Sequence, residues 1–174
     1  MSLKRFKFLL RCCTFDDRET RNERRRTDKL APMRETFEKF VEKCNSNYCV
    51  EQNVTIDEIL EGFRVRCPFR QYIPSKPNKY GIKIFATVCA NTLYTLNLEI
   101  YAGKQPGGPC SVSNSPLDVV LRLSKPIFNR GRNVIVNNWF TSIDVKEALK
   151  DKKLSYVVTI RKNKKEIPPP APVL

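Results

Sequence analysis

The sequence predicts an α/β fold in which a helical segment precedes a sheet of mixed strand direction. Between residues 33 and 48, apolar side chains recur at helical spacing, and charged side chains occupy the positions between them. From Val54 onward the period shortens to β-branched runs bounded by turn residues. After residue 115 such runs alternate with short amphipathic segments, the pattern of parallel strands joined by helices.

The chain begins with a basic segment that we expect to be helical, followed by an arginine-rich polar stretch from Asp16 to Asp28. Pro32 suits the first turn of the next helix, because a proline there loses no hydrogen bond. The apolar stripe of this helix is typical of a packing face. Its members are Met33, Phe37, Phe40, Val41, Cys44 and Tyr48.

Three strands are predicted in the middle of the chain. Residues 54–57 form a short β-branched run that ends on a carboxylate. Residues 81–90 and 93–101 are rich in β-forming side chains, and the Asn91-Thr92 pair between them predicts a hairpin. A long loop separates the first of these strands from the hairpin.

The second half of the chain alternates helix and strand. Ser115, Pro116 and Asp118 combine a capping residue, a first-turn proline and an acidic first turn, so a helix is predicted to start there. Residues 133–137 are typical of a buried strand, Ser142 is predicted to cap a short helix ending at Lys150, and residues 154–160 form the last strand. Residues 161–174 are basic and then Pro-rich, and continue neither strand nor helix.

This order, β-β-β-α-β-α-β after a helical segment, is that of an RNase H-like domain, here incomplete. In that fold the first and fourth strands lie side by side, and their carboxylates hold divalent ions that assist phosphoryl transfer. The first strand supplies Asp57, whereas the fourth ends at Asn137 and Asn138. An aspartate at the end of a short strand is also commonly a turn or cap residue, and the pattern alone leaves that alternative open.

The charge indicates a polyanionic partner. Thirty-two Lys and Arg against 18 Asp and Glu give a net charge of +14, concentrated in residues 1–35, 61–80 and 121–165. Separated basic blocks suit a nucleic-acid backbone, although a solvated basic surface without a partner is the alternative. No stretch approaches the roughly 18 apolar residues of a membrane span, and the short apolar run before Arg11 is not typical of a signal peptide.

The cysteines and the absence of histidine exclude several kinds of site. There are seven Cys, none in a C-x-x-C pair, and no His. Zinc sites that use histidine are therefore excluded, a four-cysteine site lacks its usual spacing, and catalysis by a Ser-His-Asp or Cys-His arrangement is excluded as well. Buried free thiols in a reducing compartment are the expected state of these cysteines.

Several blocks of the sequence resemble those of piggyBac transposases. Residues 62–83, GFRVRCPFRQYIPSKPNKYGIK, resemble the signature block of that family. Residues 55–58 resemble the block with its first catalytic aspartate, and residues 137–142, NNWFTS, its Asp-Asn-Trp-Phe-Thr-Ser block, whose first position is the second catalytic aspartate. Residues 161–168 resemble a later basic motif, and the segment from residue 10 to 34 resembles the one before the catalytic domain, so nearly the whole chain is covered.

The resemblance implies a DDE/D-type transposase that cleaves and transfers DNA strands with divalent metal ions. This sequence departs from it at Asn137, and the family's third catalytic aspartate and its Cys-rich zinc domain lie outside the sequence. A neutral amide is a poorer ligand for a hard cation than a carboxylate. We therefore expect an inactive protein with Asp57 as a weak or lost Mg²⁺ ligand and no zinc site. An active transposase or nuclease is the alternative, and a decayed coding sequence is a third.

The resemblance also implies domains and partners. Residues 1–52 are predicted to be the helical end of the dimerisation and DNA-binding region, 53–160 a partial catalytic domain, and 161–174 a tail. A nuclear protein that binds double-stranded DNA is expected. The side chains expected at DNA are Arg64, Arg66, Arg70, Lys76, Lys79, Lys83, Arg161, Lys162, Lys164 and Lys165.

A homodimer is a further expectation, because a segment outside this sequence covers the sheet in the resembled fold. Apolar strand residues without that cover would favour association. These residues are Val134, Ile135, Val136, Val157 and Val158.

Overall fold

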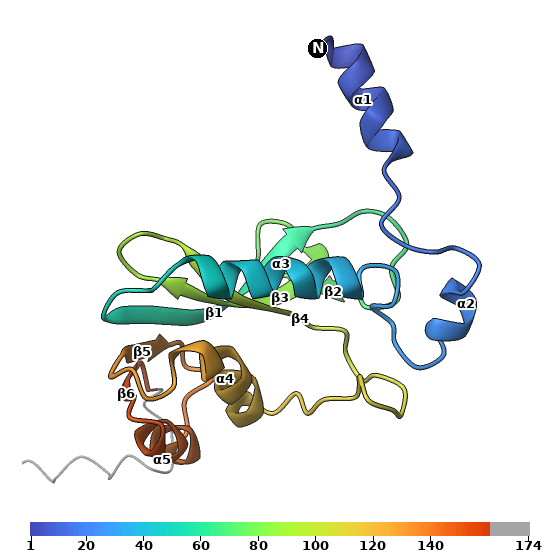
Figure 1. Ribbon diagram of the computed structural model, residues 1–174. Coiled ribbons are helices and arrows are strands. Elements are labelled where there is room, and N and C mark those ends of the chain that lie inside the picture. Colours follow the sequence, from blue (N-terminus) through green and yellow to red (C-terminus); the bar gives the residue numbers. More distant parts are fainter. Residues whose placement is uncertain (161–174) are drawn as a thin grey trace, which may run out of the picture.

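The computed structural model describes residues 1–160 as a mixed α/β structure (Figure 1). The predicted fold class is confirmed. The elements are α1 (Leu3–Cys12), α2 (Arg21–Arg24), α3 (Arg34–Asn47), β1 (Asn53–Gly62), β2 (Gln71–Tyr72), β3 (Tyr80–Cys89), β4 (Thr95–Ile100), α4 (Pro116–Ser124), the 3₁₀ turn η1 (Lys125–Ile127), β5 (Asn133–Val136), α5 (Ile143–Asp151) and β6 (Ser155–Val158).

The strands form one sheet with the order β2-β3-β1-β5-β6, and β4 also pairs with β3. β1, β2 and β4 each run antiparallel to β3, whereas β5 runs parallel to β1 and β6 parallel to β5. The predicted neighbourhood of the first and fourth long strands is therefore present as the β1–β5 pair. Its register sets Ile56 opposite Val136.

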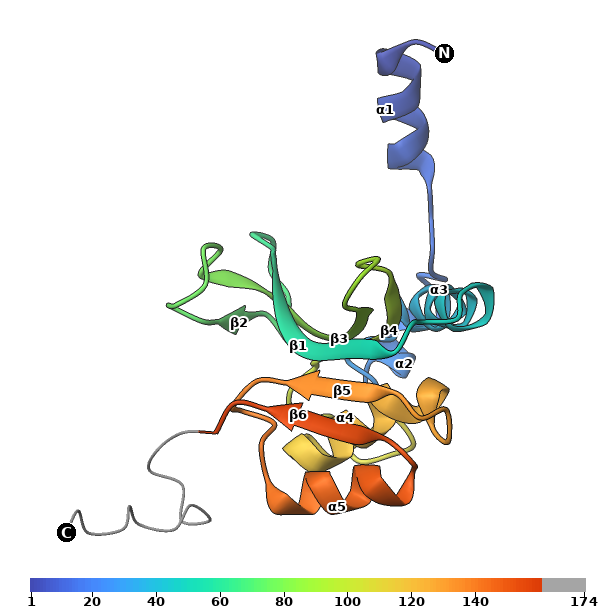
Figure 2. The same ribbon diagram turned by 90° about the vertical axis from the view of Figure 1, so that its left-hand side faces the viewer.

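Helices α4 and α5 lie together on one face of the sheet (Figure 2). They bury the main core, in which Val54 and Ile56 of β1 and Val134 and Val136 of β5 are at most 3% exposed. The expectation that Val134 and Val136 would lack cover was wrong, because alternate residues of a strand point to opposite faces and these two point toward α4 and α5. Val157 lies on the other face and is 52% exposed.

A second, smaller core lies where α3 packs along β4 (Figure 1). Met33 and Phe37 of the predicted helical stripe pack there, but Phe40 is 56% exposed, so its inclusion in the stripe was wrong. No residue of α3 is fully buried; Phe37, Val41 and Cys44 are half-buried on one line, and Phe40 lies one residue away from it. Pro32 also precedes the helix, since Met33 is its N-cap residue.

The helix starts predicted in the second half are confirmed by their caps. The Ser115 hydroxyl accepts a hydrogen bond from the Asp118 main-chain N–H, and the Ser142 hydroxyl accepts one from the Val145 N–H. Each cap satisfies a donor that the first helical turn leaves unpaired. Helix α1 stands apart from the remainder of the structure with no buried residue (Figures 1 and 2). Among residues 1–160, no helix is long and apolar enough to span a membrane.

Candidate site at the ends of β1 and β5

The structure brings Asp57 and Asn137 together. The Asn137 side-chain N–H donates a hydrogen bond of 2.6 Å to Asp57 Oδ1, and the Glu58 main-chain N–H donates one of 2.7 Å to the same oxygen. The pair lies where β1 continues past the end of β5. Ile56 and Val136 are the last paired residues, and Asp57 and Asn137 directly follow them in the sequence. Asp57 is exposed, and Asn137 is half-buried.

The orientation of the Asn137 amide is fixed from its other side. Its Oδ1 accepts a hydrogen bond of 2.9 Å from the Trp139 main-chain N–H, so its nitrogen is the atom that faces Asp57. An amide nitrogen carries two hydrogens and no free lone pair, so it donates hydrogen bonds but does not bind cations. Within residues 1–160, no three Cys, Asp or Glu side chains gather closely enough to hold a metal ion.

Glu58 lies beside Asp57 in sequence but on the opposite face of β1, since successive side chains alternate. The Lys83 ammonium lies 3.3 Å from its Oε2 and also contacts the rings of Phe85 and Trp139, at 4.8 and 4.9 Å from their centroids. The Lys83 side chain is only 15% exposed. Sequence reasoning did not anticipate Glu58 as its partner, because the β1–β3 register, which pairs Leu60 with Lys83, is what places the two side chains on one face.

The loop of residues 63–79, which carries half of the predicted DNA-contacting residues, leaves the sheet where Gly62 pairs with Gly81. It returns close to the site: Lys76 Nζ donates a hydrogen bond of 3.3 Å to the main-chain oxygen of Glu58, the residue after Asp57. Figure 2 shows β2 on the same side of the molecule as the carboxyl ends of β5 and β6. The loop thus lies beside the Asp57–Asn137 pair along β1, and the two together are called the Asp57–Asn137 surface below.

The basic side chains of this surface differ in their surroundings. Arg64, Arg66 and Lys79 are exposed, and their charged groups make no hydrogen bond or ion pair within the described part of the chain. The Arg70 guanidinium donates a hydrogen bond to the Arg64 carbonyl and lies 5.2 Å from the centroid of the Tyr80 ring. Lys76 and Lys83 are both engaged with Glu58. The predicted contacts Arg161, Lys162, Lys164 and Lys165 lie outside the described residues.

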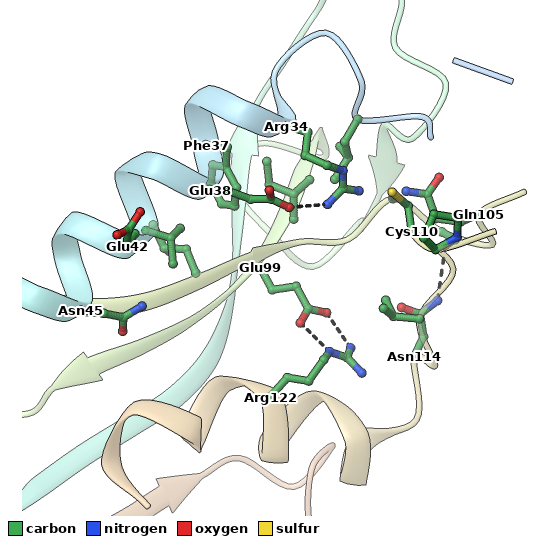
Figure 3. Close-up of a pocket in the computed structure, with 18 residues that line it drawn as sticks. Arg34, Phe37, Glu38, Glu42, Asn45, Glu99, Gln105, Cys110, Asn114 and Arg122 are labelled. Atoms are coloured by element: carbon green, nitrogen blue, oxygen red, sulfur yellow. Dashed lines mark hydrogen bonds and ion pairs between the residues drawn. The ribbon is translucent and has the colours of Figure 1, made fainter. Parts of the chain in front are cut away.

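A cavity of about 610 Å³ lies elsewhere, between α3, β4, α4 and the loop that joins β4 to α4 (Figure 3). Among its charged lining groups, Arg122 donates two hydrogen bonds to Glu99, at 2.8 and 2.7 Å, and Arg34 donates one of 2.9 Å to Glu38. Glu42 also lines the cavity. The cavity shares no residue with the Asp57–Asn137 surface.

Comparisons with known proteins relate both the sequence and the fold to transposases. The family model described as Transposase IS4 matches residues 1–172. A chain in the solved structure described as the cryo-EM structure of piggyBac transposase synaptic complex with hairpin DNA is 42% identical, with a TM-score of 0.85. The match covers 97% of this chain and 35% of that one, so the chain spans about a third of the length of the solved transposase.

Proposed function

Because this chain belongs to the IS4/piggyBac transposase family, we propose that it binds DNA beside Asp57 and Asn137 and does not cut it. The similar solved transposase is described in a complex with hairpin DNA. DNA is therefore the class of ligand that the relationship suggests. The proposal has two parts, the loss of cutting and the retention of binding, and each has its own support.

The observation that carries the loss of cutting is the hydrogen bond from Asn137 to Asp57. Transposase-type strand cleavage needs carboxylate oxygens that hold divalent ions against the reacting phosphate. Here the atom that faces Asp57 is a donor, and it occupies the place where a cation would need an oxygen. A single exposed carboxylate binds Mg²⁺ weakly, because Mg²⁺ gives up its hydration water reluctantly.

Binding is supported by the charge of the neighbouring surface. Residues 62–98 contain six basic side chains and no Asp or Glu. Three of the six, Arg64, Arg66 and Lys79, have no partner within the described chain, so their charge is available to phosphates. Arg and Lys contacts of this kind neutralise phosphates and release condensed counterions, which makes binding tight at low salt and insensitive to base sequence.

A salt titration tests the binding part. Affinity for a duplex of arbitrary sequence is measured between about 50 and 200 mM salt for the chain and for the triple variant Arg64→Gln, Arg66→Gln, Lys79→Gln. The slope of log affinity against log salt should become shallower by up to about 0.9 for each lost phosphate contact. The matched control Lys125→Gln, Lys146→Gln, Lys150→Gln removes the same charge from exposed positions at α4 and α5.

The two variants give opposite expectations. The control should keep most of the slope of the unmodified chain, because its residues lie on the face of the sheet that α4 and α5 cover. An equal decrease of the salt slope in both variants would mean that net charge alone attracts the DNA. The binding part of the proposal is abandoned if the unmodified chain fails to retain duplex even at the lowest salt.

A further inference from the structure

Two exposed tyrosines lie against each other at the base of the loop, with their rings tilted by 33°. Tyr72 in β2 lies directly opposite Tyr80 in β3, and their ring centroids are 4.7 Å apart. Tyr72 is 56% exposed and Tyr80 is 53% exposed, although large aromatic side chains usually bury most of their surface. A ring pair with half of its surface in water can still accept another flat ring.

The pair is held in place by the structure around it. Main-chain hydrogen bonds from Ile73 to Lys79 (2.9 Å) and from Lys76 to Ile73 (3.2 Å) close the turn between the two tyrosines. Before β2, Phe69 is 7% exposed and anchors the incoming strand in the smaller core. The rings are therefore presented from a short strand pair rather than from a free loop, and little conformational entropy is lost when a ligand stacks on them.

The surroundings of the pair are cationic. The Arg70 guanidinium lies over the Tyr80 ring, Lys79 is adjacent in sequence, and the hydrogen bond from Lys76 to the Glu58 main chain places the turn next to the Asp57 site. Aromatic faces interleaved with cations suit a flat, anionic ligand, because the rings stack on its base while Arg and Lys contact its phosphates.

We propose that Tyr72 and Tyr80 form a stacking platform for an unpaired DNA nucleotide beside the Asp57–Asn137 site. This inference rests on the proposed function and specifies the ligand further, as DNA that contains unpaired nucleotides. A base within an intact duplex already stacks on both neighbours and offers no free face, whereas a base in an overhang or beside a break does. The platform therefore predicts a preference for DNA with unpaired nucleotides over blunt duplex of the same length.

The preference is measured with two probes, a blunt DNA duplex and the same duplex with a four-nucleotide 3′ overhang that contains 2-aminopurine. Stacking on the tyrosines should quench the 2-aminopurine fluorescence and favour the overhang by about tenfold, the lower part of the range for one stacked base. The double variant Tyr72→Leu, Tyr80→Leu should lose both the quenching and the preference, while its affinity for blunt duplex stays within about twofold.

Two further variants separate stacking from folding. Tyr72→Phe with Tyr80→Phe keeps the rings and should keep the preference. Phe40→Leu removes a ring that is as exposed as Tyr72, at 56%, but lies on α3, and should change nothing. If the leucine variant retains the preference, or if the phenylalanine variant loses it, the platform is wrong.

The outcomes also separate this inference from the proposed function. Salt-dependent binding of blunt duplex without any preference for the overhang overturns the platform and leaves the proposed function intact. Failure to bind either probe overturns both. An overhang of RNA with the same sequence serves as a competitor, and tighter binding of that RNA than of the DNA overhang would contradict the assignment to DNA.

Discussion

Asn137 differs from an aspartate by one atom, a nitrogen in place of a carboxylate oxygen. That nitrogen faces Asp57 because the amide oxygen is held by the Trp139 main-chain N–H. Strand order predicts that residues 57 and 137 lie side by side, and the structure agrees. The direction of the hydrogen bond could not be predicted, since it depends on how the chain turns after β5.

At the residue scale, Asn137→Asp should make stability depend on divalent cations. Two carboxylates in hydrogen-bonding distance repel each other, so one of them should acquire a raised pKa. The resulting loss of stability, about 1–3 kcal/mol, should be present at pH 7 and should vanish below the unfolded-state pKa near 4, where both carboxyls are protonated. Mg²⁺ or Mn²⁺ at pH 7 should restore part of it by binding between the two groups.

Thermal melts in EDTA and in Mg²⁺ measure this effect, with the unmodified chain as reference. Asn138→Asp is the matched control, because it adds the same charge one residue later. We expect the melting temperatures of the unmodified chain and of the control to be nearly the same in EDTA and in Mg²⁺. A large Mg²⁺ response from the unmodified chain would mean that Asp57 and Asn137 already form a cation site.

At the scale of elements, the close approach of β1 and β3 positions the loop. A Cβ on residue 81 would lie 2.2 Å from the Glu61 carbonyl oxygen, a main-chain atom that cannot move aside without shifting the strand. Gly81→Ala should therefore destabilise the fold by more than about 2 kcal/mol. Gly107→Ala is the control, because nothing lies within 4 Å of its Cβ position.

Chemical denaturation gives the stability change, and limited proteolysis shows where it acts. Cleavage of the Gly81→Ala variant should increase within residues 63–79, because the loop depends on the Gly62–Gly81 pairing for its exit from the sheet. Equal stability of the two alanine variants would show that the strands can separate at no cost.

A second element-scale contact fixes the N-terminal segment. Asp28 is buried and accepts hydrogen bonds from Arg34, from the Gln105 side chain at 2.9 Å and from the Leu30 main-chain N–H at 2.9 Å. Burial raises the pKa of Asp28, but these hydrogen bonds, that from Arg34 foremost, outweigh it and hold the pKa below its usual value. The segment before α3 is thereby tied to the loop after β4.

Asp28→Asn should cost about 1.5–3 kcal/mol at pH 7, the range for hydrogen bonds to a charged group. A depressed carboxyl pKa stabilises the fold above the unfolded-state pKa near 4, and this contribution is lost as pH falls through the folded-state pKa. The difference in free energy of unfolding between the variant and the unmodified chain should therefore shrink below about pH 4. Urea denaturation at several pH values tests this, with the exposed Asp151→Asn as control.

The elements that sequence patterns predicted are those whose determinants are local. The caps at Ser115 and Ser142 and the 93–101 strand of the hairpin depend on neighbouring residues and were found as expected. The two-residue strand β2 was not predicted, because it exists only through its pairing with β3. The Lys83–Glu58 pair was missed for the same reason, since its partners are 25 residues apart in sequence.

At the scale of the whole molecule, residues 1–160 leave two notable apolar surfaces in water. Helix α1 exposes five large apolar side chains, namely Leu3, Phe6, Phe8, Leu9 and Leu10. The sheet face opposite α4 and α5 exposes fewer, with Ile59 at 45% and Val157 at 52%. Apolar clusters of this kind usually mark association sites, and α1 is the larger of the two.

We therefore predict that the isolated chain self-associates mainly through α1. Sedimentation should give an apparent mass that rises with concentration, and Phe6→Gln with Leu10→Gln should return it toward 20.2 kDa, the mass of one chain. The matched pair Ile59→Gln and Val157→Gln should have a smaller effect. If the Ile59→Gln and Val157→Gln pair had the larger effect, the sheet face would be the association surface. A chain that is monomeric at all concentrations would exclude association through either surface.

At the scale of the whole molecule, we propose that DNA is bound at the Asp57–Asn137 surface and left uncut. One incubation tests both halves: labelled duplex with the purified chain in Mg²⁺ or Mn²⁺, divided between a native gel and a denaturing gel. We predict a retarded complex on the native gel and full-length strands on the denaturing gel. A nicked or joined strand that appears only with the metal ion and disappears in Asp57→Ala would contradict the account.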